Sequence, residues 1–254
     1  MAPVSSRVEE LERRVAELTL AVETRDTFIA VAGHELRNPM TPIIGQIELL
    51  LAAVQAGRAS PEQVGQRLGR IQQAVRHYVK RAAILLDVSR ITSGKLQLEL
   101  ETFDIAPLLR DVASEYAEVA KRVGVPLALT VPDSLVVTWD RLALEQIMDN
   151  LVSNAIKYGG STPVGIMARA GGGWVHIEVR DGGAGIPAAD WERVFGRFER
   201  AVGLGERRSG FGIGLWVVGQ LVTAMGGTVT VGDAPGGGGL FTLALPQHAE
   251  GAHP

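Results

Sequence analysis

Cysteine is absent from this sequence of 254 residues. Disulfides and thiolate metal sites are therefore excluded, any metal must bind oxygen or nitrogen, and a cytoplasmic location is expected. No apolar run approaches the roughly 18 residues of a membrane span, and the start of the chain is too charged for a secretory signal. The formal net charge is only -3, with the arginines scattered among acidic residues, so nucleic acid is not an expected partner.

Two common phosphate-binding patterns are also missing. The sequence has no Walker A motif, and the glycines Gly210, Gly212 and Gly214 do not complete G-x-G-x-x-G, because Leu215 and Val217 occupy the positions of the third glycine. What the chain does have is an ordinary globular composition, 46% hydrophobic and 21% charged, and enough length for two domains.

The first part of the chain has helical periodicity. Apolar residues recur at spacings of three and four from Val8, as in a short coiled coil, and then every seventh residue to Leu50, which predicts one long helix. Ser60 and Pro61 are typical of an N-cap and a first helical residue, so a second amphipathic helix is expected over residues 64–86. An antiparallel hairpin of two such helices cannot bury its apolar face alone. We therefore expect a homodimer that forms a four-helix bundle.

After Gly94 the pattern changes to short strands between helices, which predicts a mixed α/β layer domain. The glycine run Gly236–Gly239 is typical of a hairpin tip. We expect strands over residues 95–100, 126–131, 135–138, 164–170 and 174–180, and helices over residues 105–122, 141–158 and 210–225.

His34 occupies position f of the heptads that place Leu36 at position a, so its imidazole is expected to face water. Pro39 and Pro42 crowd the helix carbonyls behind them, which predicts a bend just past the histidine. A neutral imidazole is a competent nucleophile toward a phosphoryl group, and the adjacent Glu35 could hold the tautomer that frees the other ring nitrogen. For this residue alone, a surface histidine that only meets solvent is the simpler interpretation.

Polar residues share one face of the second expected helix of the α/β domain. Asn150, Asn154, Lys157 and Tyr158 are spaced by four, seven and eight residues, so they lie on one side. Two amide oxygens there could ligate Mg²⁺, and the lysine could contact phosphate oxygens. A solvated polar face is the alternative for this segment taken alone.

Glycines mark two further places. Asp181 follows an expected strand beside Gly183 and Gly185, which permit close backbone approach, and this arrangement suits an adenine amino group. The series Gly210–Gly214 opens a helix whose bare N–H groups would bind a triphosphate, although a lone glycine triplet is usually only a turn. Residues 199–209 hold arginines able to neutralise phosphate and are expected to form a mobile lid, with a disordered surface loop as the alternative.

These motifs resemble those of a known family. Residues 34–39, His-Glu-Leu-Arg-Asn-Pro, resemble the phosphoacceptor box of the sensor histidine kinases of two-component signalling. Five later segments resemble, in order, the nucleotide-binding boxes of the Bergerat-type ATPase domain: residues 150–158, 181–186, 195–198, 210–215 and 236–241. The implied fold class is α + α/β, in which an N-terminal helical hairpin dimerises into a four-helix bundle and a Bergerat-type α/β sandwich binds ATP.

The resemblance implies that ATP and Mg²⁺ support autophosphorylation of His34. The phosphoryl group would then pass to an aspartate on the receiver domain of a separate response regulator. Glu35 and Asn38 would also serve the reverse reaction by orienting a water molecule that dephosphorylates the regulator. Input is expected from a separate sensor protein, from a segment outside this chain or through the coiled coil itself.

The resemblance also assigns domains and site residues. Residues 1–27 would be a coiled-coil signalling helix, 28–94 the dimerisation and phosphotransfer hairpin, 95–246 the ATP-binding domain and 247–254 a flexible tail. The implied catalytic residues are His34, Glu35 and Asn38, and the implied metal ligands are Asn150 and Asn154. The implied nucleotide-binding residues are Asn150, Asn154, Lys157, Tyr158, Asp181, Gly183, Gly185, Ile186, Phe198, Arg207, Arg208, Gly210, Gly212, Gly214 and Leu215.

Two other functions stay open at this point. A Bergerat-type ATPase without histidine transfer, as in chaperones, topoisomerases and mismatch-repair proteins, would lack the His-Glu-x-x-Asn-Pro helix. A dimerisation or phosphotransfer module with a decayed nucleotide site would not be expected to keep the asparagine, aspartate and glycine motifs. The remaining histidines have no partner pattern and are expected to be structural or solvated: His77, His176, His248 and His253.

Overall fold

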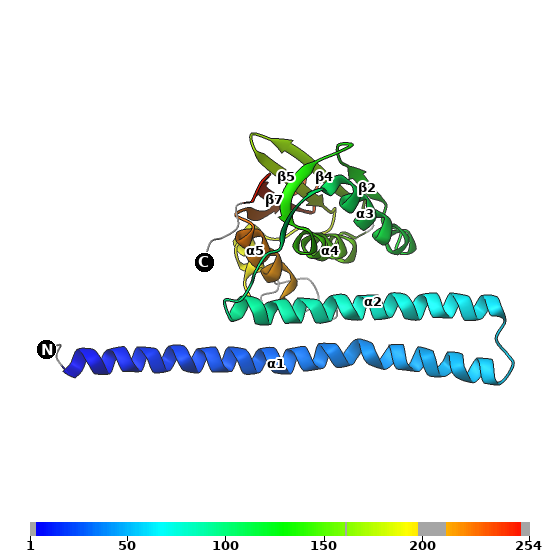
Figure 1. Ribbon diagram of the computed structural model, residues 1–254, viewed down its shortest axis with the longest axis horizontal. Helices are drawn as coiled ribbons and strands as arrows, with labels where there is room; N and C mark the ends of the chain where they lie inside the picture. Colours follow the sequence, from blue (N-terminus) through cyan, green and yellow to red (C-terminus); the bar gives the residue numbers. More distant parts are fainter. Residues whose placement is uncertain (1–3, 161, 198–211, 250–254) are drawn as a thin grey trace. The chain divides into compact units, whose positions relative to one another are not determined.

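The computed structural model describes residues 4–160, 162–197 and 212–249 (Figure 1). The chain divides into two compact units, Met1–Leu86 and Asp87–Pro254. Among the described helices, none meets the length and hydropathy that a membrane span requires.

The first unit is a helical hairpin, as predicted. Its helices are α1 (Val4–Gln55) and α2 (Pro61–Thr92), and α2 continues into the second unit. Gly57 turns the chain between them with a φ of 64°, which favours glycine. The N–H of Gln63 donates to Ser60 Oγ and the N–H of Ser60 donates to Gln63 Oε1, both at 3.2 Å. This reciprocal capping box fixes the start of α2.

A small apolar cluster joins the two helices of the hairpin. Ile43 and Leu50 of α1 pack with Ile71 of α2, and none of the three is more than 9% exposed. α1 stays helical through Pro39 and Pro42, so neither proline ends it. The hairpin leaves many apolar side chains at least 41% exposed: Val8, Leu11, Val15, Val22, Ile29, Ile44, Ile47, Leu49, Leu51, Val54, Leu68, Val75, Val79 and Leu86.

The second unit contains a sheet of five strands in the order β2-β4-β5-β7-β6 and a separate pair, β1 and β3. β2 runs parallel to β4, and the other neighbours in the larger sheet are antiparallel. The strands are β1 (Leu100–Asp104), β2 (Leu127–Thr130), β3 (Val136–Asp140), β4 (Val164–Gly171), β5 (Trp174–Arg180), β6 (Thr228–Asp233) and β7 (Gly239–Pro246).

Helices α3 (Ile105–Arg122), α4 (Arg141–Tyr158) and α5 (Gly214–Ala224) lie along one face of the larger sheet (Figure 1). Alternate residues of β5, including Val175 and Ile177, are 0% exposed because they face this helical layer. The α + α/β class expected from the sequence is confirmed, and α3 and α4 have the predicted bounds.

Two predicted elements begin later than expected. The strand over residues 95–100 is wrong, since β1 begins at Leu100 opposite Asp140, where β3 ends and α4 starts. Residues 95–99 therefore have no strand to pair with. The helix expected from Gly210 begins at Gly214, because Gly212 has a left-handed φ of 64°.

The end of the described chain also differs from its prediction. The N–H of Thr138 donates to the carbonyl of Gln247 at 2.9 Å, and the N–H of Ala249 donates to the carbonyl of Thr138 at 3.1 Å. Residues 247–249 thus extend the small sheet beside β3, and the flexible tail predicted from residue 247 is wrong for them. Residues 250–254 lie outside the described chain.

Candidate functional site

Asp181 follows β5 directly and is held by the hairpin that joins β6 to β7. Its N–H donates to the carbonyl of Gly239 at 2.9 Å. Its Oδ1 accepts the N–H of Gly183 at 2.8 Å and the N–H of Gly239 at 3.2 Å. Among the described residues, Oδ2 accepts no hydrogen bond. The carboxylate is thus fixed in place with one oxygen left for a ligand.

The glycines around Asp181 are required by close backbone approach. A Cβ on Gly183 would collide with the carbonyl oxygen of Tyr158, and a Cβ on Gly159 would lie 2.9 Å from the Asp181 Cβ. At Gly238, whose φ is 97°, a Cβ would lie 2.5 Å from the Cα of Gly182. The end of α4, the end of β5 and the β6–β7 tip therefore meet here. Sequence reasoning singled out Gly183 but not Gly159, whose signal was its position at the end of the polar helix.

The predicted glycine tip is confirmed and has a second role. Gly236, Gly237 and Gly238 have φ angles from 92° to 97°, as a tight hairpin end requires. Gly185 has a φ of 70°, and a Cβ there would lie 3.2 Å from the carbonyl oxygen of Gly238. The tip thus packs on the loop after β5 and shapes the surroundings of Asp181.

Asn150 connects α4 with the start of α5. Its Nδ2 donates to the carbonyl of Gln146 at 2.9 Å, which fixes the side-chain amide. A Cβ on Gly214 would lie 2.5 Å from Asn150 Oδ1, so any other residue at that position would displace this amide. Asn154, one turn later, is half-buried on the same side of α4.

The N-terminus of α5 could bind an anion. Its N-cap residue, Ile213, makes no side-chain capping hydrogen bond and is 0% exposed. Among the residues that the structure describes, no side chain caps the first N–H groups of α5. Leu215 in the first turn is half-buried.

Lys157 and Tyr158 lie at the other end of the polar face of α4. Lys157 Nζ is 4.9 Å from the centroid of the Tyr158 ring, a distance at which a cation is attracted to the ring face. Ile186, in the loop after β5, is half-buried, and its carbonyl accepts the indole N–H of Trp191 at 2.8 Å. This last contact was not foreseen.

Two aromatic contacts that sequence reasoning missed flank the site. Arg197 lies 5.4 Å from the ring centroid of Trp216 on α5, and burial lowers the pKa of the Arg197 guanidinium. Phe195 meets Phe241 of β7 edge-to-face, with centroids 6.4 Å apart. They hold residues 195–197 against α5 and β7.

Several predicted site residues are outside what the structure describes. The side chains of His34, Glu35 and Asn38 are among them, although their backbone belongs to α1. The predicted outward position of His34 therefore stays a prediction. Four predicted nucleotide-binding residues also lie outside the described residues: Phe198, Arg207, Arg208 and Gly210.

The described residues fit a nucleotide. Asp181 Oδ2 can accept an amino hydrogen, and the first N–H groups of α5, which no described side chain caps, can donate to phosphate. Within the described residues, no group of three or more His, Cys, Asp or Glu could hold a metal ion. A magnesium ion here would therefore depend on amide oxygens together with phosphate oxygens and water.

Two family models match the chain. Residues 24–94 match the His Kinase A (phospho-acceptor) domain, and residues 139–249 match the histidine kinase-, DNA gyrase B-, and HSP90-like ATPase. The domain limits drawn from the sequence at residues 28 and 95 stay predictions.

Relatives match nearly the whole chain. The sensor histidine kinase RcsC of Escherichia coli (strain K12) is 31% identical over an alignment of 256 positions, which covers 98% of this chain and 26% of RcsC. The sensor histidine kinase TmoS of Ectopseudomonas mendocina is 32% identical over an alignment of 259 positions, which covers 99% of this chain and 26% of TmoS. This chain thus spans about a quarter of the length of these relatives.

Solved histidine kinases share the fold. AdeS of Acinetobacter baumannii matches with a TM-score of 0.57 at 23% identity, covering 84% of this chain and 98% of AdeS. Full-length ShkA, in complex with AMPPNP, matches with a TM-score of 0.61 at 27% identity, covering 89% of this chain and 47% of ShkA. The resemblance inferred from the sequence is confirmed. The phosphoacceptor and ATPase domains occur in one chain, in the order of the sequence motifs, and the chain belongs to the sensor histidine kinases of two-component signalling.

Proposed function

We propose that this chain uses ATP to phosphorylate His34 and passes the phosphoryl group to an aspartate on a separate response regulator. The proposal rests on one observation: two other parts of the domain meet at α4. The loop after β5 reaches α4 at Asp181, and the start of α5 reaches it at Asn150. The same chain has the box His-Glu-Leu-Arg-Asn-Pro over residues 34–39.

Each described side chain has a role in this reaction. Asp181 Oδ2 accepts a hydrogen bond from the adenine amino group, and its fixed Oδ1 holds the carboxylate in that orientation. The N–H groups at the start of α5 bind the phosphates, and Lys157 neutralises part of their charge. Asn150 and Asn154 offer amide oxygens to Mg²⁺, which supplies charge neutralisation when bound. The structure of full-length ShkA in complex with AMPPNP supports ATP as the nucleotide.

The transfer exchanges one phosphorus bond for another. A ring nitrogen of neutral His34 attacks the γ-phosphorus, the bond from that phosphorus to the bridging oxygen breaks, and ADP leaves with the electron pair. The imidazole proton passes to Glu35, which also fixes the reactive tautomer. The aspartate of the regulator then attacks the same phosphorus and His34 leaves. Asn38 and Glu35 also orient a water molecule that removes the phosphoryl group from the regulator.

The active unit is a homodimer that forms a four-helix bundle through the hairpin. Apolar side chains such as Leu68, Val75 and Val79 are 41% to 59% exposed in the single chain. A second copy would remove this surface from water. A separate sensor protein as the input and a cytoplasmic location stay predictions.

A Bergerat-type ATPase without histidine transfer is the competing function. The ATPase model covers gyrase- and HSP90-like proteins and so does not separate the two functions. The match of residues 24–94 to the phosphoacceptor domain supports transfer.

The test is to incubate the purified chain with γ-labelled ATP and Mg²⁺ and to follow acid-labile label on the protein. We expect the label on the wild type and its loss in His34→Gln. His248→Gln is the matched control, because His248 contacts Thr138 in the small sheet, 3.1 Å from its Oγ1. Label that survives in His34→Gln would refute the assignment of His34. Mixing His34→Gln with Asp181→Asn chains then decides between transfer within one chain and transfer across the dimer.

A further inference from the structure

The linker between the hairpin and the ATP-binding domain is fastened at both ends. Residues 95–99 belong to no helix or strand. At the first end, the N–H of Lys95 donates to the carbonyl of Arg90 at 2.8 Å, and Gly94 has a φ of 66°, which is a left-handed cap of α2. This segment follows α2 without helical or strand hydrogen bonds, so a hinge within it would turn the ATP-binding domain relative to α2.

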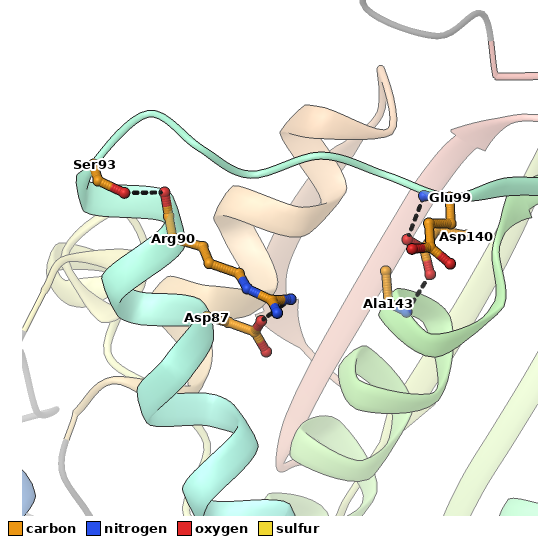
Figure 2. Close-up of polar contacts among 6 residues, drawn as sticks. All are labelled: Asp87, Arg90, Ser93, Glu99, Asp140 and Ala143. Atoms are coloured by element: carbon orange, nitrogen blue, oxygen red, sulfur yellow. Dashed lines mark hydrogen bonds and ion pairs between the residues drawn. The ribbon is translucent and has the colours of Figure 1, made fainter.

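The other end is held by Asp140, the last residue of β3 (Figure 2). Its two carboxylate oxygens have different partners. Oδ1 accepts the N–H of Ala143 in the first turn of α4, and Oδ2 accepts the N–H of Glu99, both at 2.9 Å. Asp140 is only 9% exposed, and hydrogen bonds to a carboxylate are strong where water is largely excluded. One side chain thus joins the end of the linker to the start of α4.

The domain side of this connection is rigid. Leu144, Ile147 and Leu151 of α4 are all 0% exposed in the core beneath the sheet, so α4 is locked by packing. Asp140 is therefore a fixed attachment point, and the linker is the part that can move. If the hydrogen bond from Glu99 to Asp140 is lost, the part of the linker that can move lengthens by one residue. The linker can then extend from the sheet in more directions.

We propose that Asp140 is a positioning residue for phosphorylation of His34. Its hydrogen bond to Glu99 ties the linker to the start of α4 and limits the hinge between the two domains to residues 95–98. This inference rests on the proposed function. A more restricted hinge raises the fraction of time in which bound ATP and His34 can react. Losing one hydrogen bond to a charged acceptor shifts such an equilibrium by about tenfold.

A neighbouring cap provides a matched control. Asp104 caps α3, but a single oxygen, Oδ1, accepts both the N–H of Ala106 at 2.9 Å and the N–H of Leu135 at 2.8 Å. Asn keeps one side-chain oxygen and is as good an N-cap as Asp. Asp104→Asn can therefore keep both hydrogen bonds, whereas Asp140→Asn can keep only the cap of α4 or the bond to the linker.

The experiment measures labelling of His34 in the full chain as kcat and KM for ATP. Asp140→Asn is expected to lower kcat about tenfold with KM within about twofold. Glu99→Pro removes the donor instead of the acceptor, at a position just before a strand where proline is tolerated, and should lower kcat equally. Because both changes break the same bond, the double variant should be no slower than either single variant. Asp104→Asn should match the wild type.

Amide hydrogen exchange identifies the bond that was lost. In Asp140→Asn the amide of Glu99 should exchange about tenfold faster, while the amide of Ala143 should stay as protected as in the wild type. A wild-type kcat in Asp140→Asn, or additive losses in the double variant, would overturn this inference alone. So would faster exchange at Ala143 with a raised KM, which would make Asp140 only a helix cap. Absence of acid-labile label on the wild type would instead refute the proposed function, and this inference with it.

Discussion

The two parts of the chain bury their apolar residues to very different degrees. In the ATP-binding domain, Leu144 and Ile177 are 0% exposed between a sheet and its helices. In the hairpin, Ile43, Leu50 and Ile71 form a small cluster, while many other apolar residues stay open to water. The ATP-binding domain therefore supplies its own core, whereas the open apolar residues of the hairpin would be buried in the proposed homodimer. This difference predicts that the two parts lose their structure by separate routes.

The largest expected effect is in the core of the ATP-binding domain. Leu144→Ala should lower the free energy of unfolding of this domain by about 3 kcal/mol, because it leaves a cavity in a packed interior. Leu142→Ala is the matched control on the same helix, since Leu142 is 70% exposed, and should change stability by less than about 0.5 kcal/mol. Thermal unfolding followed by calorimetry measures both. Similar losses in the two variants would contradict the core assigned to α4.

The hairpin is tested next through its dependence on a second chain. Val75 is 41% exposed on the apolar stripe of α2, and Val75→Glu would place a charge in the dimer interface. The dissociation constant of the dimer should rise by about 100-fold, which is about 2.7 kcal/mol. Sedimentation equilibrium measures the change, with Gln66→Glu, at an exposed position on the opposite face of α2, as the control. An unchanged dimer in Val75→Glu would show that this stripe is not the interface.

The sequence predicted helices more fully than it predicted contacts between distant segments. The bounds of α3 and α4 were predicted from the local sequence, and in the structure Asp104 and Asp140 cap these two helices. Order in residues 247–249 could not be foreseen, since it depends on pairing with β3, about 110 residues earlier in the chain. Local patterns specify helices, but a contact between distant segments is specified only by the folded sheet.

The candidate site shows the same limit. Asp181 and the glycines beside it were visible as a strand end followed by a turn. The requirement for glycine at position 159 was not visible, because a Cβ there would collide with the carbonyl oxygen of Ala155 and would also lie 2.9 Å from the Cβ of Asp181, which is distant in the sequence. The division of the Asp140 carboxylate between Ala143 and Glu99 was also hidden, since one of its partners is 41 residues away.

A smaller effect concerns pH and belongs to the ATP-binding domain. Burial, with the negative charge of Asp149 second, raises the pKa of Tyr116 above its ordinary 10.0. The folded state therefore keeps the phenol protonated, and the associated stability is present below pH 10.0 and lost as the pH rises above it. Tyr116→Phe should flatten this alkaline loss and cost at most about 1 kcal/mol at neutral pH. Tyr78→Phe in the hairpin should leave the alkaline loss in place, and urea unfolding at several pH values distinguishes them.

The smallest effect compares how the two parts cap their helices. Ser60 is exposed, and its hydroxyl stabilises only the first turn of α2. Ser60→Ala should cost about 0.5–1 kcal/mol, seen as a lower melting temperature of the hairpin at fixed protein concentration, and Ser60→Asp should restore it. Asp104 also accepts the N–H of Leu135, from a segment 31 residues away, so Asp104→Ala breaks a connection between distant segments as well as a cap. We expect the larger shift from Asp104→Ala, and in the transition of the ATP-binding domain alone. Equal shifts would mean that the bond to Leu135 adds nothing to the stability of that domain.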